Sequence, residues 1–412
     1  MRVLVLWRQW TVDMKMRNTD IDHAFCFKRY DTDNEYFYFN MYRGRFAEDY
    51  AWIDKKMFDV VIFHYSCMEL RGSGKHWDNF VYLMTSIWKE YPCRKIIMVQ
   101  DDYTRTQGIW DLAIGIRADK IYTVMRECNH HILYPKSKIG NIEVKTVLTG
   151  YVEESYINKI SLQNHRQRKY DVVYRANKLP YVYGKHGQLK HELALYFNEH
   201  LKDSGLVYDL AGTDGNKGAV LGDNWLEFLA SSRMTVGCLG GSGFADITGE
   251  YRERAKEYTA SHTHATYEET KAACFPDVEE NLAGVISPRI FDAAITKTCQ
   301  ILVGEDYQGI LIPDVDYIVL NSDFSNINEV IEKMKDIDYC EEIANNCYEH
   351  IVKSQKYSYE KFAKWLINDI GNIDHLQIPS SDLSKYIERM CQKNNDMVMN
   401  DILLREKQRG DK

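Results

Sequence analysis

Residues near position 290 combine a proline, a cation and a carboxylate at helical spacing. Segment 287–303 reads Ser-Pro-Arg-Ile-Phe-Asp-Ala-Ala-Ile-Thr-Lys-Thr-Cys-Gln-Ile-Leu-Val. This pattern predicts a loop, a short helix and a buried strand, because Pro288 suits a first helical turn, where its missing N–H would have no partner. Arg289 and Asp292 are three residues apart and share one face near the positive end of that helix. A guanidinium suits phosphate and a carboxylate suits a ribose diol, so the pair indicates a site for a nucleotide diphosphate.

The rest of the chain must supply the elements that position such a site. Short apolar runs alternate with helical stretches, which is the pattern of parallel βαβ packing. The expected strands are 3–6, 60–63, 95–99, 120–124, 143–148, 172–174, 206–211, 235–239, 300–303 and 317–320. The expected helices are 75–91, 188–202, 225–230, 288–297 and 326–335. The polar segment 153–169 is interpreted as a linker, because it lacks the apolar spacing of a core element.

Three more segments carry a family resemblance. They are 170–180 (Tyr-Asp-Val-Val-Tyr-Arg-Ala-Asn-Lys-Leu-Pro), 300–313 (Gln-Ile-Leu-Val-Gly-Glu-Asp-Tyr-Gln-Gly-Ile-Leu-Ile-Pro) and 317–330 (Tyr-Ile-Val-Leu-Asn-Ser-Asp-Phe-Ser-Asn-Ile-Asn-Glu-Val). Together with 287–303 they resemble the C-terminal domain of GT-B glycosyltransferases of the "glycosyl transferases group 1" type, in particular the branch related to spore-maturation glycosyltransferases. The resemblance covers roughly residues 90–370.

This resemblance implies an α/β protein of the GT-B class, with two Rossmann-like domains facing a central cleft and ligands at the C-terminal ends of the strands. We expect an N-terminal acceptor-side domain over residues 1–153 and a nucleotide-sugar-binding domain over 170–355. Residues 356–412 would form C-terminal helices, the first of which is placed to cross back to the N-terminal domain.

The chain departs from the family at the donor sugar. Most retaining members carry Glu-x7-Glu; here the second position is Asp292 and the first falls on Gly284. Asp246 and Glu250 are candidates to replace the missing carboxylate. The run Gly-Gly-Ser-Gly at 240–243 resembles a phosphate cradle, which makes Gly241 and Ser242 candidate binding residues, but it matches neither the dinucleotide fingerprint nor a P-loop.

Two cations follow the first strand of the second half. Arg175 and Lys178 are three residues apart, just after the strand expected at 172–174. In the resembling family this loop faces the donor, where two cations can clamp the pyrophosphate and stabilise the leaving nucleotide diphosphate. Lys185 and His186 are weaker candidates of the same kind. The alternative interpretation is a solvated basic loop.

Candidate acceptor-side residues follow two strands of the first half. His64 comes directly after the strand 60–63, and a histidine is a natural general base for an acceptor hydroxyl in an inverting reaction. A structural histidine under a loop is an equally good interpretation. Asp101 and Asp102 follow the strand 95–99 and could be that base or hold acceptor hydroxyls. An adjacent Asp pair also suits a metal or a helix N-cap, although the metal-binding Asp-x-Asp of the other glycosyltransferase fold has one residue between its acids.

Composition limits the class of protein. At 412 residues with 45% hydrophobic content, the chain is expected to bury two cores. The formal net charge of −8 predicts no nucleic-acid partner, because binding a phosphate backbone needs a basic surface. Ten cysteines without a Cys-x-x-Cys pair indicate neither zinc nor disulfides. Without an apolar run of ~18 residues or a signal peptide, we expect a cytoplasmic protein, with peripheral contact at the inner face of the membrane left open.

These observations lead to one main hypothesis and two alternatives. The main hypothesis is a glycosyltransferase that moves a sugar from a nucleotide diphosphate sugar to a hydroxyl of a glycan or lipid-linked acceptor in cell-surface polysaccharide synthesis. It would need no cofactor and no metal, because the resemblance implies that protein cations hold the pyrophosphate. The alternatives are a sugar-nucleotide epimerase of the same fold and a catalytically silent GT-B-like binding subunit. The lost first glutamate favours the silent subunit.

Overall fold

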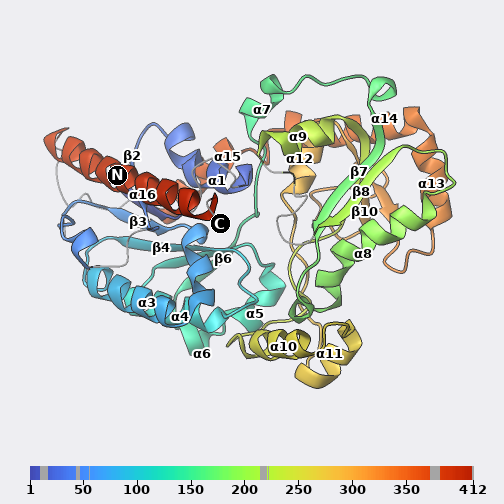
Figure 1. Cartoon of the computed structure of the whole chain (residues 1–412). Coiled ribbons are helices and arrows are strands. Elements are labelled where there is room, and N and C mark those ends of the chain that lie inside the picture. Colours follow the sequence, from blue (N-terminus) through green and yellow to red (C-terminus); the bar gives the residue numbers. More distant parts are fainter. Residues whose placement is uncertain are drawn as a thin grey trace. The chain divides into compact units, whose positions relative to one another are not determined.

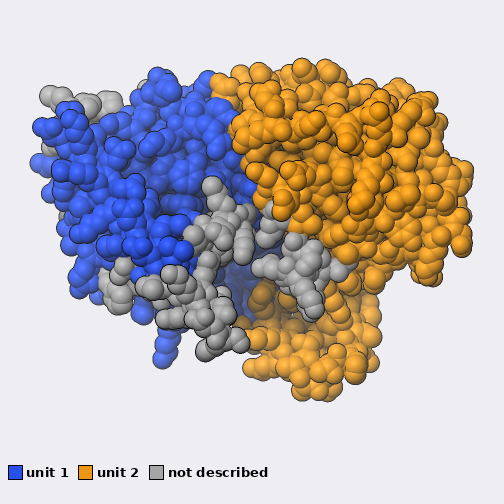
Figure 2. Space-filling view, turned by 45° about the horizontal axis from the view of Figure 1, so that its top comes forward, with its two compact units in different colours: residues 1–147, 245–249, 363–412 blue, residues 148–244, 250–362 orange. Residues whose placement is uncertain are grey.

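The structure is a computed structural model with two parallel β-sheets, each covered by helices (Figure 1). It describes residues 1–9, 17–42, 47–54, 56–213, 220, 222–371 and 381–410. The chain divides into two compact units (Figure 2). Unit 1 comprises Met1–Val147, Ala245–Gly249 and Ala363–Lys412, and unit 2 comprises Leu148–Phe244 and Glu250–Phe362.

Unit 1 is built on a six-stranded sheet in the order β2-β1-β3-β4-β5-β6, in which all neighbouring strands are parallel. Its strands are β1 (Arg2–Trp7), β2 (Glu35–Asn40), β3 (Val60–Phe63), β4 (Arg94–Val99), β5 (Lys120–Thr123) and β6 (Glu143–Thr146). Every residue of β1 and β3 is buried. Continuous apolar strands of this kind require helices on both faces of the sheet.

The helices of unit 1 meet that requirement. They are α1 (Asn18–Tyr30), α2 (Tyr65–Met68), α3 (Lys75–Trp88), α4 (Thr106–Ile116), α5 (His130–Leu133), α6 (Lys136–Ile139) and α16 (Ser381–Gly410), with 3₁₀ turns at η1 (Ala47–Tyr50), η2 (Glu69–Ser73) and η3 (Glu127–Asn129). The chain leaves β1 toward one edge of the sheet and leaves β3 toward the other. Because such crossovers are right-handed, α1 and α3 cover opposite faces (Figure 1).

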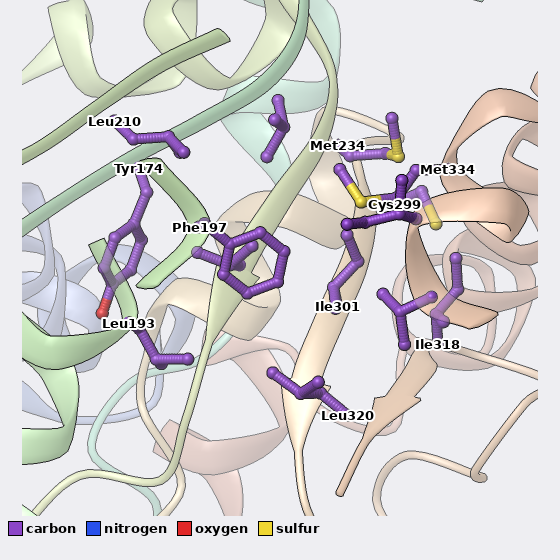
Figure 3. Packing of buried hydrophobic residues seen from close by; sticks show 14 of the residues in the cluster. Tyr174, Leu193, Phe197, Leu210, Met234, Cys299, Ile301, Ile318, Leu320 and Met334 are labelled. Carbon is purple, nitrogen blue, oxygen red and sulfur yellow. The ribbon is translucent and has the colours of Figure 1, made fainter. Parts of the chain in front are cut away.

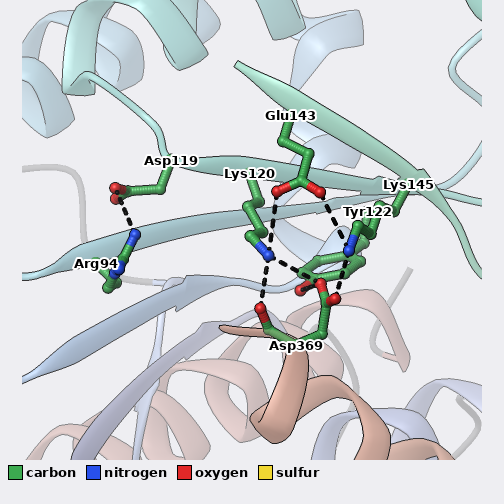
Figure 4. Close-up of polar contacts among 7 residues, drawn as sticks. All are labelled: Arg94, Asp119, Lys120, Tyr122, Glu143, Lys145 and Asp369. Carbon is green, nitrogen blue, oxygen red and sulfur yellow. Dashed lines mark hydrogen bonds and ion pairs between the residues drawn. The ribbon is translucent and has the colours of Figure 1, made fainter. Parts of the chain in front are cut away.

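Helix α15 (Tyr359–Ile370) is shared between the units, since unit 1 begins again at Ala363. Its Asp369 carboxylate accepts hydrogen bonds from Lys120 at 3.0 Å and Tyr122 at 2.7 Å, and also pairs with Lys145 (Figure 4). Glu143 pairs with both lysines at 3.1 Å. Strands β5 and β6 therefore hold the end of α15 through charge as well as packing.

Unit 2 has a five-stranded sheet in the order β11-β10-β9-β7-β8, again parallel throughout. Its strands are β7 (Tyr170–Asn177), β8 (Tyr208–Thr213), β9 (Ser232–Gly237), β10 (Cys299–Val303) and β11 (Ile318–Leu320). Its remaining elements are α7 (Glu154–Lys159), α8 (Gly184–His200), α9 (Asp223–Ala230), α10 (Glu250–Ser261), α11 (Tyr267–Cys274), α12 (Arg289–Ile295), α13 (Ile327–Lys335), α14 (Ile337–Cys347), a π-helix η6 (Tyr348–Lys353), and the 3₁₀ turns η4 (His165–Gln167) and η5 (Tyr181–Tyr183).

Alternating side chains of the unit 2 strands enter two core clusters. On β10, Ile301 packs in a cluster with Phe197 of α8 and Met334 of α13 (Figure 3). Leu302 packs in the other cluster, with Phe291 of α12. Successive strand residues point to opposite faces of a sheet, so α8 and α12 lie on opposite faces. Helix α8 follows β7 and helix α12 leads into β10, so the first residues of both helices lie near the carboxyl edge of the sheet.

All ten predicted strands are present, and among the residues that the structure describes one further strand was not predicted. Strand β2 (Glu-Tyr-Phe-Tyr-Phe-Asn) is buried from its second residue on, where α16 packs along it. Its two-residue alternation is hidden, because aromatic residues occupy both faces. The predicted linker 153–169 contains α7 and η4. Among the described residues, no helix is both long and apolar enough to cross a membrane.

Candidate functional site

The centre of the candidate site in unit 2 is the first turn of α12. Arg289 and Asp292 lie on this turn, as predicted, and the helix starts behind Pro288. The Asp292 carboxylate accepts a hydrogen bond from the indole N–H of Trp225 on α9, at 2.9 Å. The guanidinium of Arg289 lies over the Trp225 ring, 4.9 Å from its centroid, and 6.0 Å from that of Tyr174. An exposed cation and a half-buried carboxylate are thus held side by side.

Arg175 is engaged by its own chain. Its guanidinium donates to both carboxylate oxygens of Asp209, each at 2.8 Å, and stacks 4.6 Å from the Phe228 ring. Only 16% of this side chain is exposed. A bidentate pair of this kind fixes the guanidinium in place. Its backbone oxygen accepts a hydrogen bond from Arg289, so Arg175 orders its neighbour. Lys178 is exposed, 5.6 Å from the Tyr181 ring.

The glycine at the first Glu-x7-Glu position is required by packing. A Cβ on Gly284 would lie 2.9 Å from Cβ of Leu239 and 3.0 Å from Cε1 of His186. His186 in turn hydrogen-bonds to the Gly240 backbone oxygen through Nε2, at 2.8 Å. Burial lowers the pKa of this imidazole, and the charge of Lys190 one turn further along α8 adds to that effect. Glycine therefore replaces the first glutamate, and the His186 side chain occupies the space beside it.

Lys190 is a cation that the sequence interpretation missed. Its Nζ lies 3.7 Å from the point where a Cβ on Gly240 would stand, near the start of the loop that follows β9. The available signal was its helical spacing, since it follows His186 by four residues on α8. Lys190 and Arg289 both act electrostatically on the thiol of Cys238, so Lys190 is a second cation in the neighbourhood of Arg289.

The carboxylate of Glu280 lies against the backbone of the glycine-rich loop 240–243. A Cβ on Gly243 would lie 2.1 Å from Oε2 of Glu280, and one on Gly184 would lie 2.5 Å from the same oxygen. Glu280 accepts hydrogen bonds from the Lys185 backbone N–H at 3.1 Å and the Tyr267 hydroxyl at 2.5 Å. The glycines thus admit Glu280 at the positive end of α8, at the place where the sequence suggested phosphate.

The other residues predicted around this loop are buried or make contacts with the protein itself. Gly241 and Ser242 are buried, Gly241 with a φ of 103°, and the Ser242 hydroxyl donates to the Phe244 backbone oxygen. Asp246 belongs to unit 1, where its backbone bridges to Thr104. Glu250 is exposed at the start of α10 and pairs with Arg254 at 3.2 Å.

In unit 1, His64 is completely enclosed. Its Nε2 lies 3.1 Å from Nδ1 of His23 on α1, and its Nδ1 lies 2.9 Å from the Ser66 hydroxyl. Burial lowers the pKa of both imidazoles, that of His23 to about 3, so the pair is neutral at pH 7. An enclosed histidine cannot meet an acceptor hydroxyl without a rearrangement, and this geometry favours the structural interpretation.

The two aspartates after β4 differ sharply. Asp102 is fully buried and accepts from the hydroxyls of Thr123 and Tyr134, while burial raises its pKa. Asp101 is exposed and has a left-handed backbone with φ of 54°. Its carboxylate accepts from the Tyr103 hydroxyl at 2.6 Å. Of the two, only Asp101 is available to a ligand.

Glu69 is an acid that the sequence interpretation missed. Desolvation by surrounding protein, followed by the negative charge of Asp20, raises the pKa of its carboxyl to about 7, although 54% of the side chain is exposed. Arg8 lies 3.8 Å away and opposes that rise. Asp101 also acts on Glu69 electrostatically, so both acids stand at the carboxyl edge of the sheet, beyond β3 and β4. The signal was its position six residues after the end of β3.

Within the described ranges, no three His, Cys, Asp or Glu side chains are arranged to hold a metal ion.

No protein-family model matches this chain, and no curated protein matches it in sequence. Among solved structures, it is similar to an alpha-glucosyltransferase in complex with UDP and a 13-mer DNA containing an HMU base, with a TM-score of 0.52, 10% identity, and coverage of 90% of this chain and 99% of that one. An alpha-glucosyltransferase with UDP and a 13-mer DNA containing a central A:G mismatch gives a TM-score of 0.51 and 9% identity over 90% and 100%. The chain has the GT-B fold.

The GT-B prediction is therefore confirmed, whereas the spore-maturation branch stays a prediction. The exclusion of nucleic acid is contradicted, because both of these similar structures contain DNA. The exclusion rested on the net charge of −8, which sums over the whole chain. A phosphate backbone meets only a local surface, and net charge does not determine how charge is distributed there.

Proposed function

We propose that this protein transfers a sugar from a nucleoside diphosphate sugar to an acceptor hydroxyl. The observation that carries the proposal is the arrangement of Arg289 and Asp292 on the first turn of α12 in a GT-B fold, both contacted by Trp225. Arg289 supplies a charge for the diphosphate, and Asp292 accepts from the ribose hydroxyls. Lys190 supplies the second charge.

These groups suit the chemistry of glycosyl transfer. The bond between the anomeric carbon and the diphosphate oxygen breaks, and negative charge collects on the departing diphosphate. Preorganised cations stabilise that charge as it develops. Arg289 is held by an indole face and a backbone oxygen, so little reorganisation is needed when the bond breaks. Arg175 contributes through its backbone oxygen, which accepts a hydrogen bond from Arg289, rather than through contact of its guanidinium with phosphate.

On the acceptor side we propose Glu69 and Asp101 in place of His64. A general base is most effective when its pKa lies near the working pH, and the pKa of Glu69 is about 7. Asp101 is exposed beyond the neighbouring strand and suits a hydroxyl of the acceptor. Glu69 takes the proton of the acceptor hydroxyl when that hydroxyl reacts.

The donor nucleotide is proposed to be UDP, which is present in both similar structures. For the acceptor we retain a hydroxyl of a glycan or lipid-linked glycan in cell-surface polysaccharide synthesis, with the enzyme in the cytoplasm or at the inner face of the membrane. A second candidate is a hydroxyl carried by a base of duplex DNA. The DNA present in those same structures favours it.

Hydrolysis of UDP-, GDP- and CMP-sugars without acceptor tests the reaction class. A transferase releases free nucleotide slowly, a sugar-nucleotide epimerase returns an isomerised sugar, and a silent binding subunit does neither. We expect release of UDP, and loss of that release in Arg289→Ala. Product formation with lipid-linked glycans, with a duplex carrying a hydroxymethylated base and with the unmodified duplex then identifies the acceptor. Isomerisation without release would overturn the proposal.

A further inference from the structure

One face of helix α9 supports both arginines of the candidate donor site. Trp225 and Phe228 are three residues apart on α9, with ring centroids 6.1 Å apart. The guanidinium of Arg289 lies over the Trp225 ring at 4.9 Å, and that of Arg175 lies over the Phe228 ring at 4.6 Å. Two guanidinium groups from different elements are thus aligned by one short helix.

Trp225 differs from Phe228 because its ring also carries a donor. The indole N–H donates to Oδ2 of Asp292 at 2.9 Å, across 67 residues of sequence. A carboxylate has about four lone-pair positions, so accepting from the indole leaves capacity for further donors. The bond fixes the plane of the carboxylate, and the face of the same ring fixes the Arg289 guanidinium. One side chain therefore contacts both groups, the Asp292 carboxylate through its N–H and the Arg289 guanidinium through its ring face.

We propose that Trp225 is the positioning residue that makes the nucleotide site select ribose over 2′-deoxyribose. The inference rests on the proposed function, in which Asp292 accepts from the ribose hydroxyls. A carboxylate held in one plane accepts from two vicinal hydroxyls at once, and it loses one of those bonds when the 2′-hydroxyl is absent. A carboxylate free to rotate re-forms a single bond with either sugar and discriminates poorly.

Two substitutions separate the hydrogen bond from the ring. Trp225→Phe keeps an aromatic face for Arg289 but removes the N–H, whereas Trp225→Ala removes both. We expect the parent protein to bind UDP at least about tenfold more tightly than 2′-deoxy-UDP, the scale of one hydrogen bond to a charged group. In Trp225→Phe this ratio falls to about twofold, while the ratio of UDP to UMP affinity is retained. In Trp225→Ala both ratios fall, because Arg289 loses its support.

Calorimetric titration of UDP, 2′-deoxy-UDP and UMP supplies these ratios without knowledge of the sugar or the acceptor. Trp365→Phe is the matched control, because Trp365 is a half-exposed tryptophan of α15 in unit 1. It should keep both ratios. A purely structural role of Trp225 would weaken all three ligands by the same factor, and this result would overturn the inference.

The result also separates the inference from the function on which it rests. If the parent protein binds none of the three nucleotides, the proposed function fails. If it prefers UDP over 2′-deoxy-UDP and Trp225→Phe keeps that preference, only the inference fails. Asp292→Asn provides a second measurement should Trp225→Phe not fold. The inference requires that this variant lose the preference, and an unchanged ratio would overturn it.

Discussion

Arg289 is the side chain on which the donor-site proposal depends most. We predict that Arg289→Ala weakens UDP binding by about 1.5–3 kcal/mol, the range for a hydrogen bond to a charged group, without unfolding the protein. Arg289 is exposed, so its removal leaves no cavity in the core. Calorimetry measures the affinity. Arg166→Ala is the control, since Arg166 is another exposed arginine of unit 2, paired with Asp338. Unchanged affinity would remove Arg289 from the site, and loss of folding would make it a packing residue.

The neutral histidine pair gives unit 1 a pH-dependent stability. The pKa of His23 is about 3 in the folded protein and about 6.5 in the unfolded chain, so between these values the unfolded chain binds the additional proton. Stability is therefore retained above pH 6.5 and falls below it, by up to about 1.4 kcal/mol per pH unit for each of the two histidines. We predict that urea unfolding between pH 7 and 4 shows this slope.

Substitution identifies the group responsible for that slope. His23→Gln should reduce it, because glutamine does not titrate and only His64 of the pair still does. His131→Gln should leave it unchanged, since His131 is exposed on α5. An equal slope in the parent and His23→Gln proteins would assign the acid sensitivity to other groups.

At the scale of elements, Asp369 decides whether the end of α15 stays attached to the sheet of unit 1. Hydrogen bonds from Lys145, Tyr122 and Lys120 outweigh the effect of burial and lower the pKa of Asp369 to about 2. A depressed carboxyl pKa contributes stability above about pH 3.8, and this contribution is lost as the pH falls through about 2.

We predict that Asp369→Asn destabilises unit 1 by about 2 kcal/mol at pH 7 and increases amide exchange in α15. The variant should also lose the extra acid sensitivity between pH 4 and 2. Asp338→Asn is the comparison, because 78% of the Asp338 side chain is exposed and surface ion pairs contribute little. Equal stability of the two variants would contradict a structural role for the network.

At the scale of the whole molecule, the chain forms two compact units, and the proposed nucleotide site lies entirely in unit 2. A ligand that binds only the folded state stabilises it by about 2.7 kcal/mol at a concentration one hundred times Kd. We predict that UDP slows amide exchange in β7, β9 and β10 and leaves β1, β3 and β4 nearly unchanged. Equal protection in both sheets would show that the units unfold together.

The sequence determined what depends on local periodicity. Alternating apolar runs and helical spacing located ten of the eleven strands that the structure describes, whereas the order of the strands within each sheet was not predicted. The same local rule placed Arg289 and Asp292 together, because residues three apart on a helix share a face whatever surrounds it. The aromatic strand β2 was missed, since alternation disappears when both faces are apolar.

The availability of the candidate side chains depends on contacts between distant parts of the chain. Asp209 on β8 accepts hydrogen bonds from Arg175 on the neighbouring strand β7. His23 contacts His64, which is 41 residues further along the chain. The donor to Asp292 comes from Trp225, on another helix. Such contacts depend on crossovers between elements, which bring together residues that local spacing leaves unrelated. The sequence therefore predicted the part of the candidate site that lies on a single helical turn. The parts that need contacts between two elements became visible only in the folded structure.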